Sequence, residues 1–174
     1  MMKTIFITGA SSGIGKATAE LFSANGWQVI ATMRNPEKGK ALTELPNTVV
    51  MPLDVTNTKQ IQETCRKTLE QYDVDVLFNN AGYGIMAPLE AFSEADIRRL
   101  FDTDVIGTMI VTQQFIPHFK KRRSGTILTT TSLAGVIGFP RDAVYGAAKR
   151  AQEGMVESLY YEMKPFGVAV KSMI

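Results

Sequence analysis

The sequence predicts an α/β fold in which helices cover both faces of a doubly wound parallel sheet. Six short β-rich runs alternate with longer stretches of helical periodicity, a pattern typical of βαβ units. The first, fourth and fifth runs are apolar over most of their length, as in strands with helices on both faces, so we expect them at the centre of the sheet. In chain order, the runs cover residues 4–8, 28–33, 48–53, 74–79, 126–131 and 168–174.

The stretches between these runs predict helices, and one of them begins with a capping pattern. Ser93 is followed three residues later by Asp96, which suits a capping pair. A chain of 174 residues is long enough for one domain with a sizeable core, so we expect a single domain over residues 1–174. The last predicted strand reaches Ile174 with no element after it, and we expect the domain to be incomplete at its C-terminal end. The predicted helices cover residues 13–25, 37–45, 58–71, 94–121 and 143–165.

Composition and charge favour a small-molecule partner. Hydrophobic residues make up 45% of the chain, and the formal net charge of +2 gives no broad electrostatic reason to expect nucleic acid. The basic run at residues 120–123 ends a helical stretch, where cations favour the negative end of the helix dipole. The apolar runs are too short for a signal peptide or a membrane span, so we expect neither secretion nor membrane insertion.

Two residues that occur only once narrow the chemistry further. Cys65 is the only cysteine, which excludes an intrachain disulfide and predicts a reduced, half-buried thiol in a cytoplasmic protein. His118 is the only histidine and lies near the end of a predicted helix, so it provides neither a Ser-His-Asp triad nor a histidine-rich metal site. Hydrolase and metalloenzyme functions are therefore disfavoured.

A glycine-rich segment joins the first predicted strand to the first predicted helix. Residues 8–15 read Thr-Gly-Ala-Ser-Ser-Gly-Ile-Gly, so backbone N–H groups and the helix N-terminus can face a pyrophosphate, as in a Rossmann fold. Its glycines remove side chains that would block close approach, although the spacing differs from Gly-x-Gly-x-x-Gly and a purely structural turn is the alternative. The residues expected to contact the dinucleotide here are Gly9, Ser11, Ser12, Gly13, Ile14 and Gly15.

The end of the second predicted strand indicates which dinucleotide is preferred. An acidic residue there would bind the ribose 2′-hydroxyl of NAD(H), whereas a basic residue favours the 2′-phosphate of NADP(H). No Asp or Glu lies between Gln28 and Pro36, and Arg34 offers a planar, charged set of donors. We therefore predict NADP(H) as the preferred cofactor, with NAD(H) as the alternative. The alternative for Arg34 itself is a solvated loop cation, because residues 8–15 contain no base to reinforce phosphate binding.

Tyr145, Lys149 and Ser132 form a candidate catalytic set. Tyr145 and Lys149 are four residues apart in a predicted helix and therefore share one face. A nearby ammonium stabilises a phenolate and brings the pKa of tyrosine closer to neutral pH, which suits proton transfer. Ser132 follows the fifth predicted strand, at the sheet edge where such folds bind ligands, and its hydroxyl can polarise a substrate carbonyl. The alternatives are an amphipathic helix with Lys149 in solvent and a turn capped by Ser132.

These motifs, in this order, resemble the short-chain dehydrogenase/reductase family over residues 4–174. The matching features are the glycine segment, Asn-Asn-Ala-Gly at residues 79–82, the serine at residue 132, and Tyr-x-x-x-Lys at residues 145–149. The resemblance implies a Rossmann fold, NAD(H) or NADP(H), and hydride transfer between the cofactor and a carbonyl or alcohol.

The resemblance also implies roles for individual residues. Tyr145 corresponds to the acid/base, and Lys149 to the residue that binds the nicotinamide ribose and lowers the pKa of the tyrosine. Ser132 corresponds to the residue that stabilises the substrate oxygen. The further cofactor contacts implied by the family are Asp54, Val55, Asn80, Ala81 and Gly82.

The sequence departs from the family at one catalytic position. An Asn-Val-x-Gly motif is usual on the long fourth helix, whereas residues 104–107 read Asp-Val-Ile-Gly. Ionised Asp104 accepts but does not donate hydrogen bonds, and it adds negative charge near Lys149. In the family, the backbone carbonyl of the asparagine also reaches a water beside the lysine, and Asp104 keeps that carbonyl. We therefore expect a working proton relay with an altered pH dependence.

The residues expected to contact the substrate give a less specific signal. Tyr83, Ile85 and Met86 follow the 79–82 motif, and residues 138–140 precede the catalytic tyrosine. Their apolar character suggests a lipophilic carbonyl compound, and loop packing is the alternative. Apolar residues on more than one face of the helices at 94–121 and 143–165 favour a homodimer or homotetramer, which the resemblance also implies.

Two functional hypotheses stay open at this point. Family members usually continue well beyond the sixth strand, so the chain is either part of an active reductase or a shortened, non-catalytic dinucleotide-binding or sensing protein. The presence of Tyr145, Lys149 and Ser132 together favours the reductase.

Overall fold

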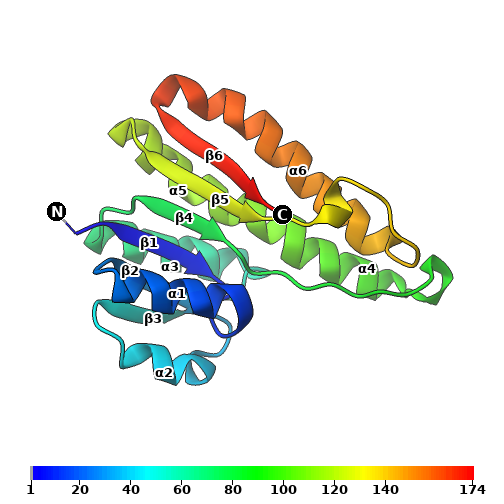
Figure 1. Cartoon of the computed structure of the whole chain (residues 1–174), viewed down its shortest axis with the longest axis horizontal. Coiled ribbons are helices and arrows are strands. Elements are labelled where there is room, and N and C mark those ends of the chain that lie inside the picture. Colours follow the sequence, from blue (N-terminus) through cyan, green and yellow to red (C-terminus); the bar gives the residue numbers. More distant parts are fainter. Residues whose placement is uncertain (1) are drawn as a thin grey trace.

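The computed structural model describes residues 2–174, which form a six-stranded parallel sheet flanked by helices (Figure 1). The strand order is β3-β2-β1-β4-β5-β6, so the chain winds outwards from β1 to β3, crosses back to β4 and continues outwards to β6. This is the doubly wound arrangement that the sequence predicts, with its switch point between β1 and β4. The strands are β1 (Thr4–Thr8), β2 (Gln28–Met33), β3 (Thr48–Pro52), β4 (Val76–Asn79), β5 (Gly125–Thr130) and β6 (Val168–Met173).

The helices follow the predicted pattern with two corrections. The predicted helix at 94–121 is divided, because the π-helical segment η3 (Asp102–Gly107) separates α4 from α5. The predicted helix at 37–45 is a 3₁₀ turn followed by one short α-helix. No helix within residues 2–174 combines the length and apolarity that a membrane span requires. The α-helices are α1 (Gly13–Ala24), α2 (Lys40–Thr43), α3 (Thr58–Gln71), α4 (Glu94–Phe101), α5 (Thr108–Arg122) and α6 (Ala143–Met163).

Local hydrogen bonds explain two of the element boundaries. Ser93 accepts a hydrogen bond from the Asp96 N–H at 3.1 Å and so caps α4, which confirms the predicted capping pair. Strand β4 begins two residues later than predicted, because the Val74 carbonyl accepts hydrogen bonds from His118 and Arg122 of α5 at 2.8 Å each. These contacts tie the start of β4 to the end of α5.

The core has two layers, one on each face of the sheet. Alternate residues of β1 point to opposite faces, so Phe6 packs with residues of α3, α5 and α6, while Ile5 and Ile7 pack with residues of α1 and α2. Full burial on both faces accounts for the unbroken apolar runs of the inner strands. The fifth predicted run forms β5, which is an inner strand as expected. Its second face is not fully covered, because Leu128 on that face stays half-buried.

Cys65 lies on α3 inside the first of these layers. Its exposed fraction is 0%, so the half-buried position expected from the sequence is wrong. Cys65 belongs to the same core cluster as Phe6 and Ile30, because α3 turns this side of the helix towards the sheet. Burial raises the pKa of the Cys65 thiol to about 12.

We expect Cys65 to be inert towards thiol reagents in the folded protein. At pH 8 the buried thiol stays protonated and out of contact with reagent, so labelling should proceed only as fast as the protein opens. Labelling with a chromogenic disulfide should be complete within minutes in denaturant and far slower in buffer. Rapid labelling of native protein would contradict this burial.

Candidate active site

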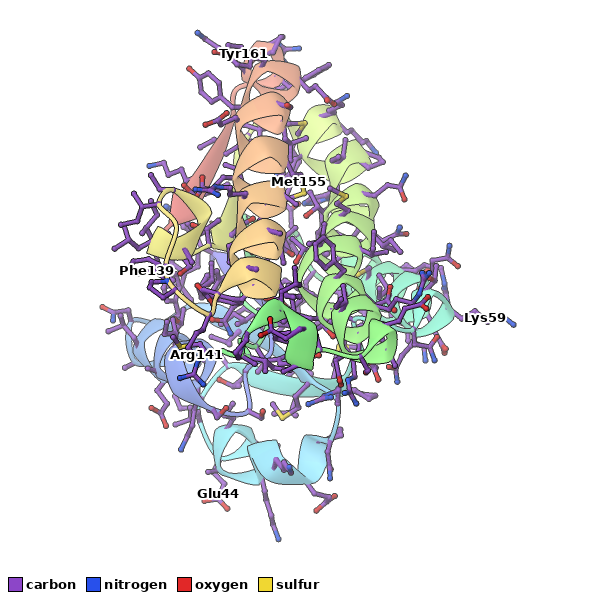
Figure 2. All side chains as sticks on the ribbon, turned by 90° about the vertical axis from the view of Figure 1, so that its right-hand side faces the viewer. Glu44, Lys59, Phe139, Arg141, Met155 and Tyr161 are labelled. Atoms are coloured by element: carbon purple, nitrogen blue, oxygen red, sulfur yellow. The ribbon has the colours of Figure 1, made fainter. Side chains whose placement is uncertain are left out.

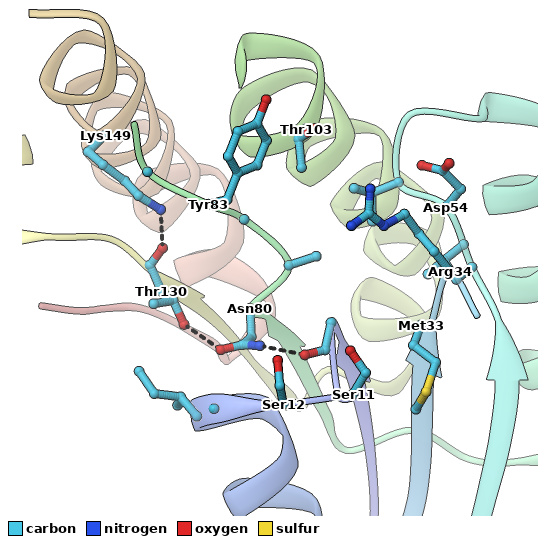
Figure 3. A pocket seen from close by; sticks show the side chains of 18 of the residues that line it. Ser11, Ser12, Met33, Arg34, Asp54, Asn80, Tyr83, Thr103, Thr130 and Lys149 are labelled. Carbon is cyan, nitrogen blue, oxygen red and sulfur yellow. Dashed lines mark hydrogen bonds between the residues drawn. The ribbon is translucent and has the colours of Figure 1, made fainter. Parts of the chain in front are cut away.

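A cleft of about 500 Å³ lies along the carboxyl ends of the strands, at the switch point of the sheet (Figure 3). It is bounded by the β1–α1 turn, the ends of β2 and β3, the segment after β4, and α6. Most of the predicted cofactor residues therefore meet in one place, although they are scattered along the chain. The predicted residues that line it are Gly9, Ser11, Ser12, Gly13, Ile14, Arg34, Asp54, Val55, Asn80, Ala81, Gly82, Tyr145 and Lys149.

The glycines of the β1–α1 turn have different roles from one another. A Cβ on Gly9 would lie 2.7 Å from Ala81 Cα, and a Cβ on Gly15 would lie 2.5 Å from Asn80 Nδ2. These two glycines therefore allow the turn to approach the protein's own chain, and Gly15 does not line the cleft. Only Gly13, with a φ of +55° and open space around it, fits the expected role of clearing room for a ligand.

The segment after β4 is fastened to the end of β1. The Thr8 hydroxyl accepts hydrogen bonds from the backbone N–H groups of Asn80 and Ala81, each at 3.0 Å. The Asn80 carboxamide donates to the carbonyls of Thr8 and Gly9, and its oxygen accepts from the Thr130 hydroxyl at 3.4 Å. Asn80 therefore builds the floor of the cleft across three strands. Sequence reasoning missed Thr130, which carries no motif, and it included Thr8 only as the first residue of the glycine segment, without a role of its own.

The β1–α1 turn leaves polar groups open to the cleft. Ser12 is the N-cap residue of α1, but its side chain does not cap the helix. Its hydroxyl and the first N–H groups of α1 are consequently free to bind oxygen atoms of a ligand. Arg34 is exposed on the far wall of the cleft, with Asp54 beside it and Lys149 at the opposite end (Figure 3). One oxygen of the Asp54 carboxylate accepts from the N–H and hydroxyl of Thr56, so this side chain holds its own loop.

Lys149 is buried, which contradicts the alternative of a solvent-exposed lysine. Its exposed fraction is 4%, and its ammonium donates to the Thr130 carbonyl at 3.1 Å and to Gln152 Oε1 at 2.9 Å. Asp104, which is fully buried, places Oδ2 at 3.3 Å from the same nitrogen. Burial raises the pKa of Asp104, while Lys149 and the Tyr83 N–H, which donates to Oδ1 at 3.1 Å, act in the opposite direction. The structure therefore has the predicted carboxyl group beside Lys149.

Tyr145 is half-buried on the same helix, one turn before Lys149. Burial raises its pKa above 10, and the carboxylates of Asp104 and Asp142 act in the same direction, while hydrogen bonding with Ser132 lowers it. The overall direction is upwards, opposite to the lowering by Lys149 that the family resemblance implies. Burial is the largest cause of this upward shift, and the Lys149 ammonium lies 5.5 Å from the centre of the phenol ring.

Ser132 and Tyr145 also line a second cleft of about 530 Å³ with apolar walls. Met86, Phe139 and Pro140 line this cleft as predicted, and Figure 2 shows Phe139 and Arg141 on the loop before α6. Tyr83 and Ile85 instead pack against a small core formed by α4, η3 and α6, and Gly138 lines a neighbouring groove. The Ser132 hydroxyl accepts from the Ala134 N–H at 3.2 Å, so it caps a turn and also reaches the cleft.

The parallel sheet, the open glycine turn and the cleft at the switch point define an α/β domain of the Rossmann type, a class of fold that binds ligands at this edge of the sheet. Residues 3–174 match the family model described as short chain dehydrogenase. The chain therefore belongs to the short-chain dehydrogenase family.

Individual relatives and solved structures agree with this assignment. Human 17-beta-hydroxysteroid dehydrogenase type 1 is 37% identical over 94% of the chain, and 3-ketodihydrosphingosine reductase of Bacteroides thetaiotaomicron is 36% identical over 95%. The chain spans 53% and 60% of the lengths of these two relatives. A short-chain dehydrogenase from Streptomyces avermitilis superposes with a TM-score of 0.95 at 35% identity, covering 99% of this chain and 65% of that one. ElxO with NADP bound superposes at 0.93 and 31% identity, covering 99% and 72%.

Replacing Asp104 by Asn should lower the pKa of Tyr145. The substitution removes a negative charge that disfavours the phenolate and leaves the Lys149 charge unpaired. The limb of the pH–rate profile that reports Tyr145 should therefore move to lower pH. Asp102→Asn, which changes an exposed carboxylate in the same segment, is the matched control. Identical profiles for wild type and Asp104→Asn would contradict this role of Asp104.

Proposed function

We propose that this chain is an NADP(H)-dependent oxidoreductase that acts on a carbonyl or alcohol substrate. The observation that carries the proposal is the position of Tyr145, which lines both the cleft at the switch point and the apolar cleft. A proton-transfer group at this junction reaches the substrate oxygen while the nicotinamide lies on its other side. Ser132 lines the apolar cleft beside it, where its hydroxyl can donate to the same oxygen.

The proposed reaction assigns separate tasks to these residues. NADPH would supply a hydride to the carbonyl carbon, or NADP⁺ would accept one from the alcohol. Tyr145 gives a proton to the substrate oxygen in reduction and takes it back in oxidation. Lys149, held at 3.1 Å from the Thr130 carbonyl, faces the cofactor cleft and binds the nicotinamide ribose. Gly13, Ser11 and Ser12 bind the diphosphate through backbone and hydroxyl groups.

The preference for NADP(H) rests on Arg34. Its guanidinium is exposed on the cleft wall at the end of β2, where the adenosine ribose of a dinucleotide lies in this class of fold. ElxO, at 31% identity, binds NADP, whereas a 3-ketoacyl reductase from Brucella melitensis at 26% identity was solved with NADH. Family membership therefore leaves the choice open, and the charge of Arg34 favours the 2′-phosphate.

The remaining parts of the proposal concern the whole protein. The apolar walls of the second cleft favour a lipophilic carbonyl compound, and the relatives' names include a hydroxysteroid and a ketodihydrosphingosine enzyme. We propose residues 1–174 as one dinucleotide-binding domain, in a cytoplasmic homodimer or homotetramer. A non-catalytic dinucleotide-binding protein is the second candidate, favoured by the pairing of Lys149 with Asp104.

Tyr145→Phe should lower turnover strongly without abolishing cofactor binding. Removal of a general acid/base lowers rates by roughly 100- to 10,000-fold, whereas the phenyl ring keeps the packing of the tyrosine. Turnover is measured as loss of reduced-nicotinamide absorbance with a panel of lipophilic ketones and aldehydes, and binding as NADPH fluorescence. Tyr161→Phe, on the exposed side of the same helix, is the control. Binding with no turnover of any substrate in the wild type would favour the non-catalytic candidate.

Arg34→Ala should weaken NADPH binding by about ten- to a hundredfold, the effect of losing a hydrogen bond to a charged group. NADH binding should change by less than about twofold, because the 2′-hydroxyl gains nothing from the guanidinium charge. Both dissociation constants are measured by fluorescence titration. Lys38→Ala, which removes an exposed cation from the following turn, should leave both constants unchanged. Equal weakening of both cofactors would contradict recognition of the 2′-phosphate.

A further inference from the structure

The ammonium of Lys149 has a protein acceptor for each of its three N–H groups. The acceptors come from three elements: the Thr130 carbonyl of β5, Gln152 Oε1 of α6, and Asp104 Oδ2 of η3, at 3.1, 2.9 and 3.3 Å. The first two are directed hydrogen bonds. The Asp104 contact is longer, and Oδ2 has no directed hydrogen bond among the described residues. Lys149 is therefore held firmly by two partners and more loosely by the third.

Gln152 also joins Lys149 to the backbone of η3. With an exposed fraction of 2%, its side chain donates from Nε2 to the Asp104 carbonyl at 2.6 Å and to the Thr108 hydroxyl at 3.2 Å. The Thr108 hydroxyl donates to the same carbonyl at 2.7 Å. The Asp104 carbonyl therefore accepts hydrogen bonds from two side chains, and Gln152 links it directly to Lys149.

We propose that Gln152 is a positioning residue for the reaction, which fixes the Lys149 ammonium and leaves its third N–H as the one that turns to the cofactor ribose. The inference rests on the proposed function of Lys149. A carboxamide holds its N–H groups too firmly to pass a proton on at neutral pH. The ionisable group in contact with Lys149 is the Asp104 carboxylate. When the ribose hydroxyl approaches, the third N–H of Lys149 turns from Asp104 to the ribose.

The charged and titratable groups around this cluster are few. Asp104 faces Lys149 from η3, and Tyr145 faces it from α6. Tyr83, from the segment after β4, donates its N–H to Asp104, and Asp142 at the start of α6 acts on Tyr145. Gln152 is uncharged, so replacing it changes the position and hydrogen bonding of the ammonium without changing the charge of the site. Variants at Gln152 therefore test the position of the Lys149 ammonium separately from the charge of the site.

The first test needs no turnover. The buried, hydrogen-bonded ammonium protons of Lys149 should exchange slowly enough for a ¹H–¹⁵N signal at low temperature and mildly acidic pH, assigned by its loss in Lys149→Met. Gln152→Met, which matches glutamine in length but cannot hydrogen bond to Lys149, should abolish that signal. Gln152→Leu is a second variant if the first does not fold. Gln28→Met, at the nearly buried start of β2, should retain it. A signal unchanged in Gln152→Met would overturn the inference.

The second test measures function. Gln152→Met should raise the KM and dissociation constant for NADPH about tenfold, the effect of one hydrogen bond to a charged group, and should change kcat less. Its effect should also be non-additive with Asp104→Asn, because both substitutions act on the same ammonium. Normal NADPH binding by both Gln152→Met and wild type would overturn the inference and leave the proposed function intact. Failure of the wild type itself to bind or turn over would overturn the proposed function, while the ammonium signal still decides whether Gln152 holds Lys149.

Discussion

The close approach of the β1–α1 turn to the segment after β4 is the constraint on which the rest of the site depends. Gly9 and Gly15 carry no side chain where one would collide with Ala81 and Asn80, and the Thr8 hydroxyl accepts two backbone N–H groups across the gap. This contact forms the floor of the cleft at the switch point between β1 and β4. The turn above it can then present Gly13 and the start of α1 to a ligand. A larger residue at Gly9 would separate the two strands' ends and remove the cleft floor.

The sequence predicted features whose signal is local. The strands, the glycine turn, the Ser93 cap and the shared face of Tyr145 and Lys149 all depend on spacing within a few residues, and the structure has each of them. Contacts between distant segments left no such signal. In the sequence, Gln152 is indistinguishable from any other polar residue of a helix. In the structure it donates hydrogen bonds to Asp104 and Thr108, which lie 48 and 44 positions earlier in the chain. The same holds for Thr130, whose carbonyl orients Lys149.

Periodicity also failed where tertiary packing changed the helix. Residues 94–121 read as one helix because the π-helical segment keeps the chain helical while shifting its register. At Gly107 a Cβ would lie 2.5 Å from the Val55 carbonyl, so the segment passes directly against the loop after β3. The wide turn of η3 brings Asp104 inwards to Lys149 at the same place. The break therefore has a cause outside the helix, which no window of local sequence contains.

The buried pair of Asp104 and Lys149 is better understood as a positioning device than as a source of stability. Taking two charges out of water costs more than their attraction often returns, and apolar replacements of such pairs are commonly neutral or stabilising by about 1–4 kcal/mol. Here the cost is offset by the Tyr83 N–H on one side and by Thr130 and Gln152 on the other. The net result is a lysine that cannot adopt another rotamer without leaving a buried charge unpaired.

This arrangement also bears on the direction of the proposed reaction. Burial raises the pKa of Tyr145, and the carboxylates of Asp104 and Asp142 act in the same direction, while hydrogen bonding with Ser132 lowers it. In the proposed reaction, the phenol form of Tyr145 is the proton donor and the phenolate form is the base. Carbonyl reduction needs a donor at the start of each cycle, whereas alcohol oxidation needs the phenolate. The raised pKa therefore favours the donor form from which carbonyl reduction starts, and in that direction the NADPH proposed to bind at Arg34 would supply the hydride.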